Sequence, residues 1–351
     1  MKEGQKKYRR CLVLAGGGGR LGTHLGTYAA ACEAGEAPDV VLGTCGGALV
    51  AALIHAEGNP VRQLDFLAGP EMYRFWCSVR TRHEAGVVAA LSGLIRRGLD
   101  RRHAPFVPDL DGDALFEVTE NWPSLNWRKD DTSIDAVVLG GRLLYQPAEV
   151  GRLRAGRTLV EPVAIGPLRA CSLLERAPSA TGSGPHSHSA VGQNVATLST
   201  EELPLQDAIR ISLTDMVYLR PAEAAGGRWL GGAVDLMPVE LAARLADEVW
   251  TDRKDPIPRW TMAPAWRAVL GIDAARRQRQ VDLAEVGLRV DNRGLSRTLP
   301  RSVLQRRLVV SRDGLKLSLR ACGNEADYRS VILAQFNEGR RRALVAMENR
   351  Q

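Results

Sequence analysis

The sequence predicts an α/β protein whose central sheet is mainly parallel and is covered by helices on both faces. Apolar runs at residues 11–15 and 40–44 are each followed by a glycine-rich turn and then by helix-forming residues, at about 22–34 and 46–56. This β-α-β-α alternation is typical of parallel sheets, because parallel strands need helical crossovers. In such sheets the active site lies at the carboxyl ends of the strands.

The second of these turns, at residues 43–47, reads GTCGG and has the pattern of a nucleophile elbow that carries a thiol. Flanking glycines let the chain fold sharply, so that the side chain of Cys45 projects at the start of a helix. A helix N-terminus stabilises a thiolate and lowers a thiol pKa from about 8.5 toward neutrality. Cys45 is therefore the predicted nucleophile, and the alternative is a buried, inert cysteine.

The first turn, residues 16–20, reads GGGGR and predicts an oxyanion site. Glycine N–H groups at a helix start approach a ligand closely and face developing negative charge. A dinucleotide-binding turn would need an acidic residue at the end of the next strand, whereas Asp39 precedes that strand. A phosphate-binding P-loop is excluded because no Gly-Lys-Ser/Thr follows the glycines.

Three segments resemble motifs of the patatin-like phospholipase family: GGGR at 17–20, LGTCGGA at 42–48 and WLGGAVDLMPV at 229–239. The resemblance covers roughly residues 8–250 and implies a three-layer patatin-like fold that acts on lipid acyl groups. It places Cys45 where the family has its nucleophilic serine and Leu230 where it has the aspartate of the dyad. The oxyanion hole that it implies is formed by these residues: Gly17, Gly18, Gly19, Arg20 and Gly46.

The cysteine in place of the family's serine and the leucine in place of its aspartate leave several functions possible. A thiol needs less activation than a hydroxyl, so Cys45 can form an acyl-enzyme without the aspartate. Without a base, hydrolysis slows more than transfer to an amine, thiol or alcohol, which favours an acyltransferase over a hydrolase. The alternative is a catalytically inactive pseudoenzyme that binds lipid or a partner protein. A third possibility is a serine hydrolase silenced by engineering of Cys45.

Other side chains could support the thiol. His24 lies one helical turn after Arg20, and packing against the elbow strand is its expected role. Asp235 has the position of a helix N-cap, so a structural role is expected there too. Asp215 is a weaker candidate than either. Arg20 could bind a carboxylate or phosphate head group or pair with an acidic residue inside the fold.

The net charge and composition of the chain indicate which classes of partner it binds. The 351 residues carry a net charge of +7, which favours anionic surfaces such as a membrane or an acyl carrier, beside a lipid or acyl-thioester substrate. No nucleic-acid motif accompanies the positive charge, so we expect no nucleic-acid partner, and we expect no cofactor. We expect no metal site either, because the histidine pair His186 and His188 lies in a Ser/Gly/Pro-rich segment that is interpreted as a loop. Six cysteines without paired spacing and the lack of an apolar leader predict a cytoplasmic protein, peripheral at membranes.

Along the chain we expect a core over residues 1–252 with a variable cap around 60–130, in which 87–95 has helical character. A basic, mostly helical extension is expected at 253–351, packed on the core. Gly140 and Gly141 predict a tight turn of a hairpin between strands at 134–139 and 143–145. Further strands are expected at 216–219 and 248–251, and helices at 205–211 and 239–245.

Overall fold

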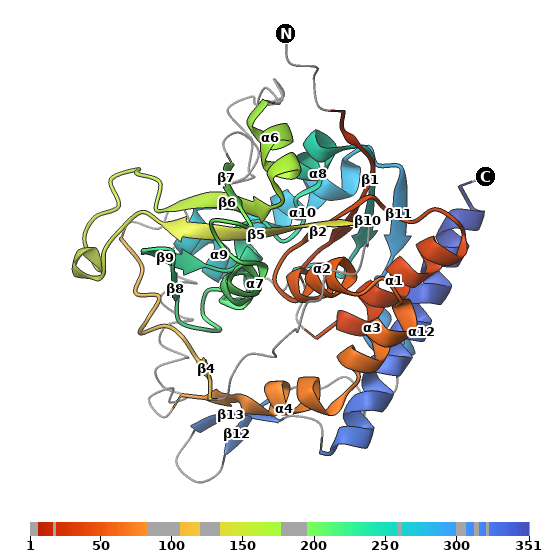
Figure 1. Ribbon diagram of the computed structural model, residues 1–351. Helices are drawn as coiled ribbons and strands as arrows, with labels where there is room; N and C mark the ends of the chain where they lie inside the picture. The colour runs from red at the N-terminus through yellow and green to blue at the C-terminus, as the bar shows by residue number, and fades with distance from the viewer. Residues whose placement is uncertain are drawn as a thin grey trace.

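The computed structural model describes residues 6–16, 19–82, 106–119, 134–176, 195–257, 262–299, 307–311, 316–320 and 323–350. Its centre is a nine-stranded sheet (Figure 1). The strands are β1 (Tyr8–Leu14), β2 (Val40–Gly43), β5 (Asp135–Leu143), β6 (Val160–Gly166), β7 (Ala196–Ser199), β8 (Ala222–Ala224), β9 (Gly227–Leu230), β10 (Ala246–Arg253) and β11 (Leu288–Asp291).

The spatial order of the main sheet is β11-β10-β1-β2-β5-β6-β7, and β9 joins β5 to β8. Every neighbouring pair from β11 to β5 is parallel, as is β6 with β7, whereas β5 runs antiparallel to β6 and β9. The predicted mainly parallel sheet is therefore confirmed. The carboxyl ends of β10, β1 and β2 meet at one edge, where the two glycine-rich turns lie.

Helices cover both faces of the sheet, which gives the predicted three layers (Figure 1). One face carries α1 (Leu21–Glu33), α2 (Gly46–Ala56), α7 (Leu205–Leu213) and α12 (Glu325–Glu348); the other carries α6 (Leu168–Arg176), α8 (Val239–Leu245), α9 (Met262–Leu270) and α10 (Ala274–Leu283). Side chains alternate along β1, so that Leu12 faces the first layer and Val13 the second. Because both faces are buried, β2 and residues 11–14 of β1 are apolar throughout.

The remaining elements are short. The cap range contains α3 (Pro60–Leu67), α4 (Pro70–Ser78), β3 (Val79–Thr81) and β4 (Phe116–Val118); the others are η1 (Pro147–Glu149), η2 (Gly232–Val234), α11 (Leu295–Thr298), β12 (Arg307–Ser311) and β13 (Lys316–Arg320). Four of them form two separate two-stranded sheets, β3 with β4 and β12 with β13. The expected helix at 87–95 and the loop with His186 and His188 lie outside the described residues. Within the described residues, no helix combines the length and apolar character needed to cross a bilayer.

The predicted hairpin at Gly140 and Gly141 is wrong, because β5 continues through both glycines to Leu143. A Cβ at Gly140 would lie 2.7 Å from Ile211 Cγ2, and one at Gly141 would overlap Val234. These glycines therefore make room for α7 and η2 against the strand and do not turn the chain. The strand expected at 216–219 is also wrong: this segment is a turn in which Tyr218 N and Leu219 N donate to the Asp215 carbonyl.

The C-terminal region contributes both to the sheet and to a helical layer. β11 extends the sheet beyond β10. α12 packs along α1 at very short range, since a Cβ at Gly22, Gly26 or Gly339 would overlap backbone atoms of the opposite helix. Small residues at these positions let the two helix backbones approach.

Substitution Gly26→Ala tests this packing. Alanine favours a helix by roughly 1 kcal/mol over glycine, but its methyl group would overlap the Phe336 carbonyl oxygen. Overpacking of this kind costs about 1–3 kcal/mol, so we expect a net loss of unfolding free energy in urea denaturation. The control is Gly323→Ala, where the new Cβ would lie 3.5 Å from Asp327 Oδ2. Equal stability of Gly26→Ala and wild type would contradict the prediction.

Candidate functional site

Cys45 lies at the sharp turn between β2 and α2. Its backbone has φ 51° and ψ −125°, a conformation that non-glycine residues rarely adopt and that costs about 1–3 kcal/mol. The residue is half-buried, and it immediately precedes the first residue of α2, Gly46. The N–H groups of a first helical turn have no partner within the helix. The geometry is thus that of a strained elbow at a helix N-terminus.

Close backbone packing forces this turn. A Cβ at Gly47 would overlap the Leu14 carbonyl oxygen of the neighbouring strand, and one at Gly43 would lie 2.5 Å from the Gly47 carbonyl oxygen. Thr44 Oγ1 accepts a hydrogen bond from Gly16 N at 2.7 Å and donates one to the Leu236 carbonyl at 3.1 Å. The elbow is therefore tied to the first glycine turn.

Asp215 is the acidic residue that contacts the thiol. Its carboxylate is buried and accepts a hydrogen bond from Ala233 N at 2.8 Å, and it lies next to the elbow because Gly231 packs against Asp215 while Gly232 packs against Cys45 N. Burial raises the pKa of Asp215 to about 6, and the bonds from Cys45 and Ala233 limit that rise. A carboxyl group with this pKa next to a thiol can exchange a proton with it near neutral pH.

The segment after α7 places Asp215 there. Ser212 Oγ accepts from Cys45 N at 2.9 Å and donates to the Leu139 carbonyl at 2.8 Å. Gly232 allows this approach, because a Cβ there would lie 2.6 Å from Cys45 N. Sequence reasoning ranked Asp215 below the other candidates. The usable signal was a carboxylate inside the otherwise uncharged run at 211–219.

Leu230, at the position that the resemblance gives to the family's aspartate, is buried in β9 opposite Gly141. The next residue, Gly231, touches Asp215: its N–H donates to the Thr214 carbonyl at 2.8 Å, and a Cβ there would lie 2.7 Å from Asp215 N. Asp215 therefore lies beside the turn that follows Leu230.

The side chains of His24 and Asp235 take part in structural contacts. Burial, with the nearby Lys254 ammonium, lowers the pKa of His24 to about 3, so its ring is neutral at pH 7, and it is hydrogen-bonded to the Ala15 backbone. Asp235 forms a buried ion pair with Arg277 at 2.8 Å. Its Oδ1 also accepts from Met237 N at 3.1 Å, although the N-cap of α8 is Pro238 and not Asp235. Both residues thus have structural contacts.

The glycine-rich loop is described at its two ends, while Gly17 and Gly18 lie outside the described residues. Gly16 N donates to Leu236 O at 3.0 Å, and a Cβ at Gly16 would lie 3.3 Å from Cys45 Cβ. Gly19 is exposed. Arg20 pairs with Asp255 at 3.1 Å, which is the internal pairing considered as its second role.

Tyr218 was not found by sequence reasoning. Burial raises the pKa of its phenol, with smaller contributions from the charges of Asp215 and Cys45. Its backbone N–H donates to the Asp215 carbonyl at 3.1 Å, and its ring lies 5.8 Å from that of Phe116. It is nevertheless 47% exposed. The preceding Val217 has φ 71°, a strained value for a β-branched residue.

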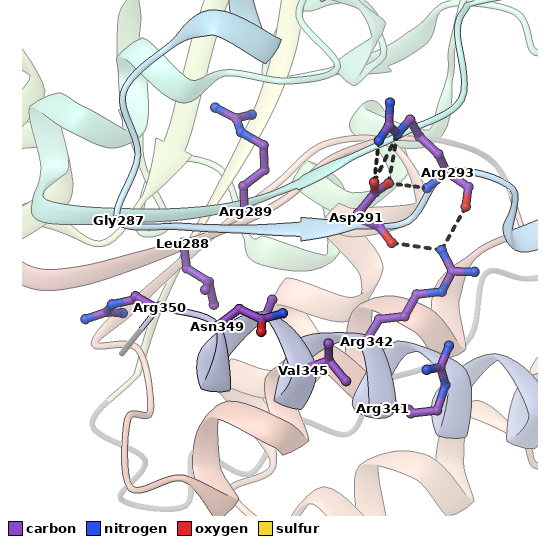
Figure 2. A pocket seen from close by; sticks show the side chains of 11 residues that line it. Gly287, Leu288, Arg289, Asp291, Arg293, Arg341, Arg342, Val345, Asn349 and Arg350 are labelled. Atoms are coloured by element: carbon purple, nitrogen blue, oxygen red, sulfur yellow. Dashed lines mark hydrogen bonds and ion pairs between the residues drawn. The ribbon is translucent and has the colours of Figure 1, made fainter.

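A groove of about 590 Å³ lies away from this site, between β11 and the end of α12 (Figure 2). Four of its five arginines pair with carboxylates: Arg293 with Asp291, Arg341 and Arg342 with Glu338, and Arg350 with Glu248. The fifth, Arg289, donates to the Ala284 carbonyl at 2.7 Å. We interpret the groove as a structural ion-pair cluster. No group of three or more His, Cys, Asp or Glu side chains that could hold a metal ion occurs in the described part of the chain.

The comparison with protein families agrees with this geometry. The model of the family described as patatin-like phospholipase matches residues 12–243, which is most of the chain. No curated protein matches the sequence closely enough to count as a relative. The matched range includes the glycine-rich loop, the elbow and the Asp215 segment, and it ends just before β10. The chain belongs to the patatin-like phospholipase family.

Proposed function

We propose that this protein transfers acyl groups from lipid or thioester donors through an acyl-enzyme on Cys45, with Asp215 as the proton acceptor. The observation that carries the proposal is the strained elbow at Cys45 with the buried carboxylate of Asp215 beside it, since the adjacent glycines Gly231 and Gly232 pack against Asp215 and against the Cys45 N–H. In this proposal, Asp215 supplies from another segment the acid that the family motif would place at residue 230.

In the first step, Asp215 accepts the thiol proton and Cys45 Sγ attacks the acyl carbonyl carbon. The thiol and carboxyl share one proton, so their titration belongs to the pair. Collapse of the tetrahedral intermediate breaks the bond to the leaving oxygen or sulfur, which departs with its electron pair and takes the proton from Asp215. A thioester on Cys45 remains.

In the second step, an acceptor attacks that thioester. Asp215 takes the proton of the attacking hydroxyl, thiol, amine or water, and the electron pair of the broken C–S bond returns to sulfur, which regains a proton. Since Asp215 can assist water as well as other acceptors, the proposal includes both an acyltransferase and an acyl hydrolase.

Oxyanion stabilisation is assigned to the N–H of Gly46 and to the glycine-rich loop. Gly46 begins α2, where the helix dipole favours negative charge. The roles of Gly17, Gly18 and Gly19 remain predictions. The net charge of +7 supports a donor held on an anionic membrane or acyl carrier, and we retain a cytoplasmic, membrane-peripheral location as part of the proposal.

An acyl adduct on Cys45 is the direct test. Incubation with an activated ester or an acyl-thioester is expected to add one acyl mass to the intact chain, because the thiol is a strong nucleophile. Cys45→Ala should abolish the adduct, and Asp215→Asn should slow its formation about 100-fold. Cys77→Ala is the control, since Cys77 is another half-buried thiol. An unmodified wild-type chain, together with co-purified lipid that Cys45→Ala retains, would favour the pseudoenzyme instead.

The pH dependence of stability tests the state of Asp215 separately. Its pKa of about 6 in the folded state exceeds the value of about 3.9 in unfolded chains. The folded state therefore binds this proton more tightly, and the contribution of Asp215 to stability falls by about 2 kcal/mol between pH 4 and pH 7. The variant Asp215→Asn has no carboxyl group at this position and therefore does not lose this stability. The difference in unfolding free energy, variant minus wild type, should thus be about 2 kcal/mol larger at pH 7 than at pH 4. Urea denaturation at both pH values measures it, and parallel behaviour would contradict it.

A further inference from the structure

The glycine-rich loop needs external support to act on a substrate. Four consecutive glycines have more backbone freedom than any other sequence of this length. Donors that stabilise an oxyanion must be fixed before the reaction, because their ordering would otherwise raise the barrier. The loop therefore requires contacts that hold its ends, and the structure shows from which part of the chain they come.

Lys254 holds the entrance of the loop. It follows β10, whose carboxyl end lies beside that of β1, and it is only 9% exposed. Its Nζ donates to the carbonyl oxygens of Ala15 and Gly16 and lies 3.8 Å from Asp252 Oδ2. The next residue, Asp255, binds Arg20 at 3.1 Å.

Gln335 of α12 holds the exit of the loop. Its Nε2 donates to the Gly19 carbonyl at 2.6 Å, and its Oε1 accepts from Gly22 N at 3.1 Å. The side chain is 1% exposed, so no water competes for these bonds. One amide group thus satisfies both a carbonyl of the loop and an N–H in the first turn of α1.

The position of Gln335 is itself fixed. Gly22 and Gly26 of α1 and Gly339 of α12 bring the helix backbones into contact on both sides of it. Tyr328 Oη donates to the Leu67 carbonyl at 2.9 Å, and Arg340 pairs with Glu33 at 2.6 Å. A small displacement of α12 would therefore move the amide that holds Gly19.

We propose that the C-terminal region, beyond the matched family range, is part of the acyl-transfer machinery: Lys254 and Gln335 are positioning residues that fix the glycine-rich loop beside Cys45. This inference rests on the proposed function. Gln335 binds the loop and the first turn of α1, whereas Lys254 Nζ donates to the carbonyl of Gly16, which packs against Cys45, so that its ammonium can also stabilise negative charge there.

Two reactions of Cys45 separate these effects. Acylation by p-nitrophenyl butyrate forms an oxyanion, whereas alkylation by iodoacetamide depends on the thiolate and forms none. Gln335→Met keeps the length of the side chain and removes both hydrogen bonds. We expect its acylation rate to fall at least 10-fold and its alkylation rate to stay within twofold of wild type. Lys254→Met is expected to slow both reactions.

Arg341→Met is the matched control, since the ion pair of this exposed arginine with Glu338 lies within α12 and does not involve the loop or α1. Both of its rates should stay within twofold of wild type. Equal effects on acylation and alkylation in Gln335→Met, or no effect on either, would overturn the role of Gln335.

Failure of the proposed function gives a different result. If wild type is alkylated but never acylated, the acyl-enzyme is wrong, and the support of the loop is then judged by hydrogen exchange of the Gly19 and Gly22 amides. Faster exchange in Gln335→Met than in Arg341→Met is expected. Equal exchange in the two variants would overturn the positioning role as well.

Discussion

The backbone of Cys45 is the constraint on which the rest of the site depends. A positive φ at a residue with a side chain persists only where its surroundings fix it, and here four glycines from three segments permit the required approach. Gly43 and Gly47 let α2 start directly above β1 and β2, Gly16 lies against the Cys45 side chain, and Gly232 lies against its N–H. The strand ends, the first loop and the turn after β9 are therefore assembled around one residue, and a side chain at any of these positions would displace it.

The carboxylate beside the Cys45 thiol comes from a segment that has no recognisable sequence motif and is brought there by the fold. Leu230 and Asp215 lie on either side of Gly231 in space, although they are well separated along the chain. The turn after α7 brings Asp215 to Cys45, and Ser212 of the same segment binds the Cys45 N–H. One segment thus supplies both the acid and a bond that holds the elbow, which links the position of the carboxylate to that of the sulfur.

Local patterns predicted the first 56 residues well, because each strand, turn and helix there is specified by neighbouring residues. β1, α1, β2 and α2 begin or end within three residues of their expected bounds. Sequence reasoning failed where distant segments decide the outcome. Gly140 and Gly141 indicate a turn in isolation, but their role is to accommodate Ile211 and Val234. Asp215, Lys254 and Gln335 carry no motif, since each is placed by tertiary packing and none by its neighbours in the chain.

The distribution of unfavourable features distinguishes a working site from a decayed one. Cys45 and Val217 have positive φ, Asp215 is a buried carboxylate and Lys254 a buried ammonium. Strain alone costs about 1–3 kcal/mol at each of the first two, and buried ionisable groups add to that cost. A fold with no use for these features would gain stability from substitutions that relieve them, because stabilising changes are common where function imposes no constraint. Ala155 and Ala225 also have positive φ, each in a turn that precedes a glycine. Cys45, Asp215 and Lys254 lie around the elbow and the glycine-rich loop, where the proposed acyl transfer needs charge and rigidity. Their concentration there favours retained chemistry over a pocket that only binds.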